Sequence, residues 1–403
     1  MVAPLLRFTE FTDDWEETTL ENLAEVERGK FSVRPRNDPR YFDGEMPFVQ
    51  TGDVAGSDMY LKGYSQTLNA DGIKVSKVFP ADTILITIAA NIGDTTITRY
   101  AVACPDSVVA IQSKKDKANT IFLKNLIDLQ KEVLDSQATQ NAQKNINLQV
   151  LKPLELFAPS IEEQTKIASF LSNVDEKISQ LTQKHQLLSQ YKQGMMQKLF
   201  SQQIRFKADD GSEFGEWEET VLEKIGAFLK GKGISKADIV EDGFTPCIRY
   251  GELYTHYGEV ISKVISATNL EIENLILSKA NDVLIPASGE TQIDIATASC
   301  VLHDDVALSG DLNIFRTKEN GVFLSYLIRS HLKMQIAQLA QGNSVVHLYS
   351  SQLKGVRLNL PCLEEQTKIA NFLSAIDQKI EVVAQQIEQA KTWKKGLLQQ
   401  MFV

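Results

Sequence analysis

Two long stretches of the chain carry the apolar spacing that is typical of a coiled coil. Positions that alternate steps of three and four residues run from Leu171 to Leu199, and again from Leu373 to Met401, and all of them are apolar except His185, Lys192 and Lys394. A seam with a 3.5-residue period, sustained over about four heptads, predicts one long amphipathic helix in each stretch. Two glutamates open each stretch, directly after Pro159-Ser160-Ile161 and Pro361-Cys362-Leu363, and acidic residues in a first turn favour the helix dipole.

The two stretches are copies of each other. Residues 162–200 align with residues 364–402 without a gap, at an offset of 202, and share 18 identities in 39 positions. The starts of the copies also repeat, since Trp15-Glu16-Glu17-Thr18 recurs as Trp217-Glu218-Glu219-Thr220. The chain is therefore a duplicated unit, with a more variable segment of roughly 150 residues before each helix. Related copies pair most simply about a pseudo-twofold axis, so we expect two antiparallel helices, each roughly 60 Å long.

The variable segments have the pattern of mixed α/β domains. Apolar runs rich in β-branched residues occupy 83–88 and 283–285, and turn-forming residues follow them at 91–94 and 287–290. Residues 47–53 parallel residues 246–252 at an offset of 199. The predicted fold class is α/β (α+β): two similar domains joined by two long helices in an antiparallel coiled coil.

Composition narrows the class without identifying a function. The 403 residues favour about two domains, and 43% hydrophobic with 23% charged residues indicates a globular protein. No run of 18 apolar residues occurs, so we expect no membrane span. The first residues lack the basic and apolar regions of a secretory signal, and the four cysteines are isolated. We therefore expect a cytoplasmic protein with reduced thiols.

The motifs of several catalytic sites are missing or incomplete. An adenine methyltransferase needs an Asn/Asp-Pro-Pro-aromatic loop, and no two prolines of this chain are adjacent. Residues 226–233 approach a phosphate-binding loop, but Gly233 stands where Ser or Thr must reach magnesium. Cys300 and His303 have the spacing of half a zinc site and no second pair. We expect no catalytic centre, metal or cofactor in this chain.

The repeated segments resemble those of type I restriction–modification specificity subunits. The most specific carriers are the two Glu-Glu-Gln-Thr-Lys-Ile-Ala sequences at 162–168 and 364–370, each after a proline and before a coiled-coil seam. Gly52-Asp53, Gly251-Glu252 and the Ile92-Gly93-Asp94 loop give weaker support. The resemblance covers nearly the whole chain.

This resemblance implies an architecture and a set of partners. Residues 1–157 and 202–359 would be target-recognition domains, each reading one half of a split site in double-stranded DNA. Residues 158–201 and 360–403 would be the conserved helices, which dock two methyltransferase subunits and, through them, nuclease/translocase subunits. S-adenosylmethionine, ATP and Mg would be bound by those partner subunits. The net charge of −10 means that attraction to phosphates must be local or must come from a partner.

Three groups of residues are candidates for contact with DNA. Basic residues follow the start of each copy, and arginine and lysine bind phosphates or reach guanine. Polar residues precede each long helix, where amide side chains could pair with adenine. A third, weaker group follows residues 246–248. The alternatives that remain open are a solvated loop for the first group, an ordinary connecting loop for the second, and core or turn roles for the third. The residues are Arg28, Lys30, Arg34, Arg36, Arg40, Lys230, Lys232 and Lys236; Gln140, Asn141, Gln143, Lys144, Asn343, Ser344 and His347; and Arg249 and Tyr250.

The near identity of the Glu-Glu-Gln-Thr-Lys segments favours two equivalent docking patches for partner subunits. Solvated helix faces are the alternative interpretation. The patch residues are Glu163, Gln164, Lys166, Glu365, Gln366 and Lys368. A scaffold protein that assembles partners through its coiled coil, without binding DNA, is the second hypothesis for the whole chain.

Overall fold

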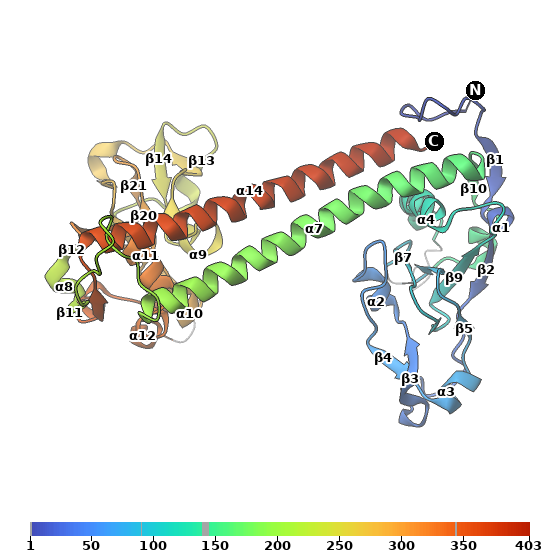
Figure 1. The fold of residues 1–403 in the computed structure, drawn as a ribbon, viewed down its shortest axis with the longest axis horizontal. Helices are drawn as coiled ribbons and strands as arrows, with labels where there is room; N and C mark the ends of the chain where they lie inside the picture. Colours follow the sequence, from blue (N-terminus) through green and yellow to red (C-terminus); the bar gives the residue numbers. More distant parts are fainter. Residues whose placement is uncertain (1, 90, 139–144, 343–344) are drawn as a thin grey trace. The chain divides into compact units, whose positions relative to one another are not determined.

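The computed structural model describes residues 2–89, 91–138, 145–342 and 345–403. The chain divides into two compact units: unit 1 is Met1–Leu181 with Gln386–Val403, and unit 2 is Thr182–Gln385. Two long helices, α7 (Ile161–Phe200) and α14 (Leu363–Met401), are each divided between the units. Each unit therefore contains one α/β part and one stretch of both helices (Figure 1).

Unit 1 contains two four-stranded sheets and a strand pair. The first sheet has the order β2 (Ala24–Arg28), β9 (Val108–Ser113), β6 (Ile84–Thr87), β7 (Thr95–Ile97). The second has the order β4 (Gln66–Leu68), β3 (Phe42–Phe48), β8 (Val102–Ala103), β5 (Val78–Phe79). The pair is antiparallel and joins β1 (Glu16–Thr19) to β10 (Glu155–Ala158). The helices are α1 (Leu20–Leu23), η1 (Pro39–Tyr41), α2 (Thr51–Ala55), α3 (Ala70–Lys74), α4 (Thr120–Leu129), α5 (Lys131–Ser136) and α6 (Leu148–Leu151).

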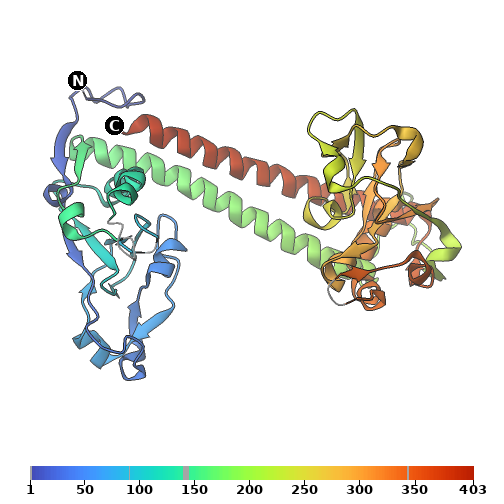
Figure 2. The ribbon, with the colours of Figure 1, turned by 180° about the vertical axis from the view of Figure 1, so that it is seen from behind.

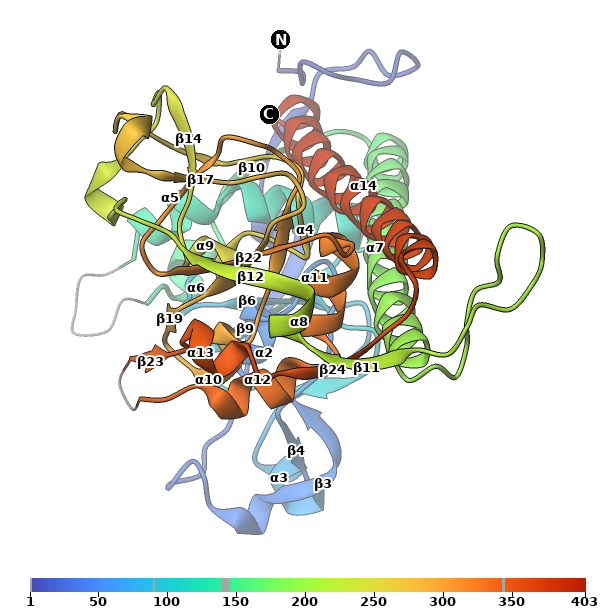
Figure 3. The ribbon, with the colours of Figure 1, turned by 90° about the vertical axis from the view of Figure 1, so that its left-hand side faces the viewer.

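Unit 2 repeats this plan with added edge strands. Its sheets have the orders β12 (Gly226–Lys230), β22 (Leu312–Thr317), β18 (Val283–Pro286), β20 (Ser299–Val301), β15 (Val260–Ile261); and β13 (Ile239–Val240), β16 (Ser266–Thr268), β14 (Thr245–Ile248), β21 (Ala307–Leu308), β17 (Ile276–Leu277). The strand pairs are β11 (Glu218–Val221) with β24 (Arg357–Leu360) and β19 (Ser288–Gly289) with β23 (Val346–His347). The helices are α8 (Leu222–Ile225), η2 (Lys236–Asp238), α9 (Glu252–Thr255), η3 (Ile272–Asn274), α10 (Gln292–Ile295), α11 (Gly321–Arg329), α12 (Lys333–Leu339) and α13 (Ser350–Leu353). Figure 3 faces unit 2, with β12 and β22 across the middle and β14 and β17 above them.

The apolar runs predicted as strands form the centres of the sheets. The run at 83–88 contains β6, whose four residues are all buried, and the run at 283–285 lies in β18, whose residues are also all buried. One strand order, β2-β9-β6-β7, recurs in unit 2 as β12-β22-β18-β20. The other, β4-β3-β8-β5, recurs as β16-β14-β21-β17. The duplication read from the sequence is therefore a duplication of the fold.

The coiled-coil seam is confirmed within each unit. In unit 1 the first half of α7 packs against the last turns of α14, and in unit 2 the last turns of α7 pack against the first half of α14 (Figure 2). The two helices are therefore antiparallel. Two seam lysines form ion pairs with the other helix, Lys394 with Asp175 at 2.6 Å and Lys192 with Asp377 at 2.7 Å. In the described part of the chain no helix is both long and apolar enough to cross a bilayer.

Candidate nucleic-acid interface

A sharp turn at a glycine exposes basic side chains at the end of the first sheet strand in each unit. β2 leads into Gly29, and β12 leads into Gly231. A Cβ atom on Gly29 would lie 2.3 Å from the Pro105 carbonyl oxygen, and one on Gly231 would lie 1.9 Å from that of Ser309. Only glycine fits this close approach of backbone to backbone. The residues on either side of each glycine are basic and exposed: Arg28, Lys30, Lys230 and Lys232.

In unit 2 this turn forms one wall of a cleft of about 930 Å³. The cleft brings together five of the residues that the sequence singled out, from two separate segments: Lys230, Lys232, Lys236, Arg249 and Tyr250. Gly310 and Asp311 line it from the loop between β21 and β22. The backbone N–H of Gly310 donates to the Gly233 carbonyl at 2.9 Å, so the loop and the basic turn are tied together.

The cleft is basic because four cationic side chains outnumber two carboxylates, Asp238 and Asp311. Hydrogen bonds from Ser235 hold Asp238 and lower the pKa of its carboxyl group, so it stays ionised. The three lysines are exposed, with their ammonium groups available to an anion. A concave basic surface of this kind suits the phosphates of a nucleic-acid backbone.

The basic residues of unit 1 are also exposed, but several are anchored to nearby acceptors. Arg28 donates through Nε to the Asp106 carbonyl, and Arg36 pairs with the Asp106 carboxylate at 2.9 Å. Arg40 pairs with Asp38 at 2.6 Å, and this hydrogen bond lowers the pKa of Asp38. Asp106 occupies the loop of unit 1 that corresponds to residues 309–311. Arg28 and Arg36 therefore gather around the equivalent of the loop that borders the cleft in unit 2.

The remaining candidates are less clustered. Lys30 and Arg34 are exposed, and Arg34 donates to the Val33 carbonyl at 2.8 Å. His347 lies on β23 with its Nδ1 atom 3.1 Å from the Ser288 hydroxyl, and it does not line the cleft. Six further candidates lie outside the described residues: Gln140, Asn141, Gln143, Lys144, Asn343 and Ser344.

The prediction that the repeated Glu-Gln pairs contact partner subunits is wrong for four of its six residues. Glu163, Gln164, Glu365 and Gln366 are each at most 1% exposed, because their own units cover them. A side chain without exposed surface cannot contact a partner, and these residues are equally not a solvated helix face. We call them the Glu-Gln clasps.

Each clasp fastens the start of a long helix to its own unit. In unit 1 Glu163 accepts two hydrogen bonds from Arg7, at 2.8 and 2.7 Å. Gln164 accepts from the backbone N–H of Asn119 at 3.1 Å, at the start of α4, and donates to the carbonyls of Lys117 and Pro159.

Unit 2 repeats the arrangement. Glu365 accepts from Arg205 at 3.0 and 2.7 Å, and Gln366 accepts from the N–H of Asn320 at 3.0 Å. Near identity in the two copies therefore reflects the same internal anchoring. Lys166 and Lys368 differ from the clasp residues, since Lys166 is 52% exposed beside Glu10 and Lys368 is 25% exposed beside Asp209.

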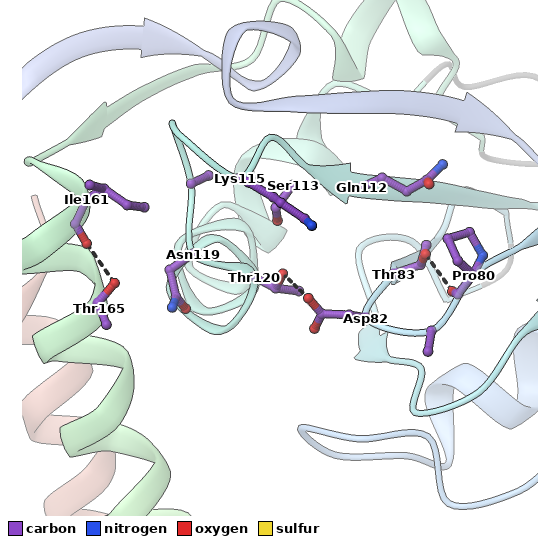
Figure 4. Close-up of a pocket in the computed structure, with 12 residues that line it drawn as sticks. Pro80, Asp82, Thr83, Gln112, Ser113, Lys115, Asn119, Thr120, Ile161 and Thr165 are labelled. Carbon is purple, nitrogen blue, oxygen red and sulfur yellow. Dashed lines mark hydrogen bonds between the residues drawn. The ribbon is translucent and has the colours of Figure 1, made fainter.

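A hollow of about 440 Å³ lies beside the clasp of unit 1, where the starts of α4 and α7 approach each other (Figure 4). Asn119, directly before α4, and Thr120, its first residue, line the hollow, and Ile161 and Thr165 line it from α7. The Thr120 hydroxyl donates to Asp82 at 2.9 Å across the hollow. The exposed side of the first turns of α7 therefore borders a recess.

The fold agrees with comparisons to known proteins. The sequence profile described as "Type I restriction modification DNA specificity domain" matches residues 12–190 and again 215–392. The chain belongs to this family. The two matches fall on the two copies found in the sequence, so each copy carries one DNA specificity domain.

Relatives that align over most of their length are described as specificity subunits of type I restriction enzymes. The chain is 24% identical to the type I restriction enzyme MjaVIII specificity subunit of Methanocaldococcus jannaschii, over 89% of this chain and 88% of the relative. It is 25% identical to the putative MjaX specificity subunit of the same organism, over 96% and 93%. The solved S subunit of a type I restriction–modification system from M. genitalium has the same fold, with a TM-score of 0.61 at 16% identity, covering 100% of this chain and 99% of that one. A chain solved in a study of complex assembly and conformational transition of a type I R-M system aligns with a TM-score of 0.56 at 13% identity, covering 95% and 96%.

One feature of the interface was missed at the level of sequence. Behind the cleft of unit 2, Glu252 is 2% exposed and anchors Arg249, and Asp53 has the corresponding place in unit 1 beside Gln50. The parallel between residues 47–53 and 246–252 was the available signal. Comparing the residues that differ within that parallel would have drawn attention to Gln50.

Proposed function

We propose that the two specificity domains each bind one half of a split site in double-stranded DNA, using the basic surfaces at Gly29 and Gly231. The observation that carries this proposal is the cleft of unit 2, which assembles four cations from separate segments beside an exposed turn. Unit 1 offers Arg28, Arg36 and Lys30 around the equivalent turn.

We also propose that α7 and α14 set the distance between the half-sites. Both helices continue without interruption from one unit into the other, over 40 and 39 residues. A helix rises 1.5 Å per residue, so inserting four residues near Gln190 would add about 6 Å, or roughly two base pairs. The degenerate spacer of the methylated site should then lengthen while both half-sites keep their sequence.

Two methyltransferase subunits would dock on the exposed sides of the repeated helix starts. The exposed residues on these sides are Glu162, Thr165, Lys166 and Ser169 in unit 1, and Glu364, Thr367 and Asn371 in unit 2. The nuclease/translocase subunits would attach to the methyltransferases. In this arrangement the chain supplies specificity without chemistry, and its partners bind S-adenosylmethionine, ATP and Mg.

Salt-dependent binding tests the role of the cleft. Each phosphate contact that is lost lowers the slope of log affinity against log salt by about 1. We expect Lys230→Gln, Lys232→Gln and Lys236→Gln, in the complex with methyltransferase, to reduce this slope and to weaken binding similarly for all sequences. Lys263→Gln is the matched control, because Lys263 is an exposed lysine of unit 2 that does not line the cleft.

Mapping of methylated adenines separates the leading function from a scaffold without DNA contact. Exchanging residues 202–357 for the matching segment of a relative should change one half-site only. A continuous methylated motif, or a change in both half-sites, would contradict the two-reader arrangement. Unchanged methylation in all lysine variants and in the exchange would favour the scaffold.

A further inference from the structure

Arg249 and Gln50 hold equivalent positions in the two units. Arg249 directly follows β14 and Gln50 lies two residues after β3, and these strands are equivalent because each pairs in parallel with a short strand, β21 or β8. Each residue stands three positions before a carboxylate, Glu252 or Asp53. The Glu252 carboxylate accepts a hydrogen bond from the backbone N–H of Arg249 at 3.1 Å. The Asp53 carboxylate accepts the equivalent bond from the N–H of Gln50 at 2.8 Å.

In unit 2 the carboxylate also fixes the arginine side chain. The Arg249 Nε atom donates to Glu252 Oε1 at 3.1 Å, and the Ser266 hydroxyl donates to the same oxygen at 2.8 Å. The Glu252 side chain is 3% exposed, whereas that of Arg249 is 27% exposed and lines the cleft. A guanidinium group held through Nε keeps its two terminal nitrogens for another acceptor.

In unit 1 the glutamine side chain is fixed by a different neighbour. Asp53 is held by the Ser65 hydroxyl at 3.1 Å, and Gln50 Nε2 donates to Gln66 Oε1 at 3.0 Å. An amide nitrogen carries two hydrogens, so this bond leaves Gln50 one N–H donor and its carbonyl oxygen. In both units a neighbouring side chain therefore fixes the orientation of Arg249 or Gln50, and part of its hydrogen-bonding groups remains available to a ligand.

Both residues lie next to the basic turns. In unit 1 the N–H of Val49 donates to the Ala103 carbonyl and the N–H of Lys30 donates to the Cys104 carbonyl, both at 2.9 Å. Gln50 and Lys30 therefore flank the same strand end. In unit 2 Lys232 donates to the Leu308 carbonyl at 3.0 Å, and Arg249 and Lys232 line one cleft.

We propose that Arg249 and Gln50 are the base-reading side chains of the two domains, Arg249 for a guanine and Gln50 for an adenine. This inference rests on the proposed function. Two parallel donors match O6 and N7 of guanine, and a donor beside an acceptor matches N7 and N6 of adenine. The lysines and arginines of the turns hold the phosphates, which position the duplex without reading it. Glu252 and Gln66 act as positioning residues, since they fix the readers before DNA arrives.

The test uses the chain in complex with methyltransferase and a duplex that carries the methylation consensus of the wild-type complex. Each guanine and adenine is replaced in turn by its 7-deaza analogue, which removes the N7 acceptor and keeps the base pair. We expect a loss of affinity of about ten- to a hundredfold at one guanine of one half-site and at one adenine of the other. Arg249→Ala should abolish the penalty at that guanine alone, and Gln50→Ala the penalty at that adenine alone.

The outcomes distinguish this inference from the function on which it rests. The wild-type complex could bind the consensus in a salt-dependent manner and yet lose no affinity at any guanine or adenine analogue. That result overturns base reading by Arg249 and Gln50 and leaves the proposed DNA binding by the two domains intact. Absence of salt-dependent binding overturns the function itself. Arg249→Met guards against a variant that fails to fold, because it keeps an unbranched stem and loses the donors: a phosphate contact at Arg249 predicts an unchanged penalty profile, whereas base reading predicts loss of the guanine penalty.

Discussion

The two clasps share most of their contacts, although the chain is continuous through only one of them. In unit 2 α7 ends at Phe200 and the chain continues into Arg205, which binds Glu365. In unit 1 the same place is filled by the end of α14 and by a separate segment that contains Arg7. The backbone bonds agree: Ile204 N–H donates to Lys198 O at 3.3 Å, and Leu6 N–H donates to Gln400 O at 2.8 Å.

The aromatic packing around the clasps repeats in the same way. Phe402 lies 5.1 Å from Phe122 and 6.2 Å from Trp15, by ring centroids. In unit 2 Phe323 lies 5.6 Å from Phe200 and 5.9 Å from Trp217. This comparison shows that side-chain packing, and not the course of the chain, specifies the clasp.

Removing the arginine of the arginine–glutamate pair should have the largest effect on stability. The size of the loss should differ between the two units, because the chain is continuous through only one clasp. Removing one partner of a buried ion pair costs about 3–5 kcal/mol, because the other charge stays buried. We expect Arg205→Met to destabilise unit 2 by this amount, since Glu365 is fully buried and the chain on both sides is held. Arg7→Met should cost less, because the segment that contains Arg7 is not continuous with the end of α14 and can separate from the unit, which lets water reach Glu163.

Chemical unfolding with hydrogen exchange, followed separately in each unit, measures both effects. Arg205→Lys is the control, because it keeps the charge and loses the two-pronged geometry. Equal losses for Arg7→Met and Arg205→Met would show that continuity of the chain does not matter here.

The seam lysines provide a second comparison, with a smaller expected effect. Lys192 lies 2.9 Å from Glu259 and 2.7 Å from Asp377, and the Tyr326 hydroxyl also donates to Asp377. Lys394 meets only Asp175, at 2.6 Å, among the described residues. We expect Lys192→Met to cost about 1–3 kcal/mol, since two partly buried carboxylates lose their partner, and Lys394→Met about 1 kcal/mol or less. Denaturant midpoints of the two variants give the comparison, and a larger loss for Lys394→Met would contradict it.

The cysteines give the smallest effect, a difference in reactivity rather than in stability. Burial raises the pKa of the thiols of Cys104 and Cys300 to about 12 and that of Cys247 to about 11, whereas Cys362 is exposed. The thiolate is the reactive form, so at pH 8 a disulfide reagent should modify one thiol per native chain and four after denaturation. Cys362→Ser should reduce the native value to zero. Fast reaction of Cys104 at pH 8 would show that unit 1 opens readily.

Regular periodicity allowed much of the fold to be predicted from the sequence. The seam from Leu171 to Leu199, the strand at 83–88 and the duplication depend on spacing along one segment, and each has its counterpart in α7, β6 and the repeated sheet orders. The basic character around Gly29 and Gly231 is equally local. These features are predictable from the sequence because an apolar stripe or run needs only some apolar surface to pack against, whichever segment supplies it.

The tertiary structure alone decided which polar side chains are buried and what they bind. Glu163 looks like a surface residue in the first turn of a helix, yet its partner Arg7 lies 156 positions away. Gln164 finds Asn119 at 45 positions, and Asp175 finds Lys394 at 219. Arg249 is a candidate base reader because the buried Glu252 fixes its side chain and because it lines a cleft that three separate segments form. A polar side chain takes its role from what folds over it, and no local pattern contains that information.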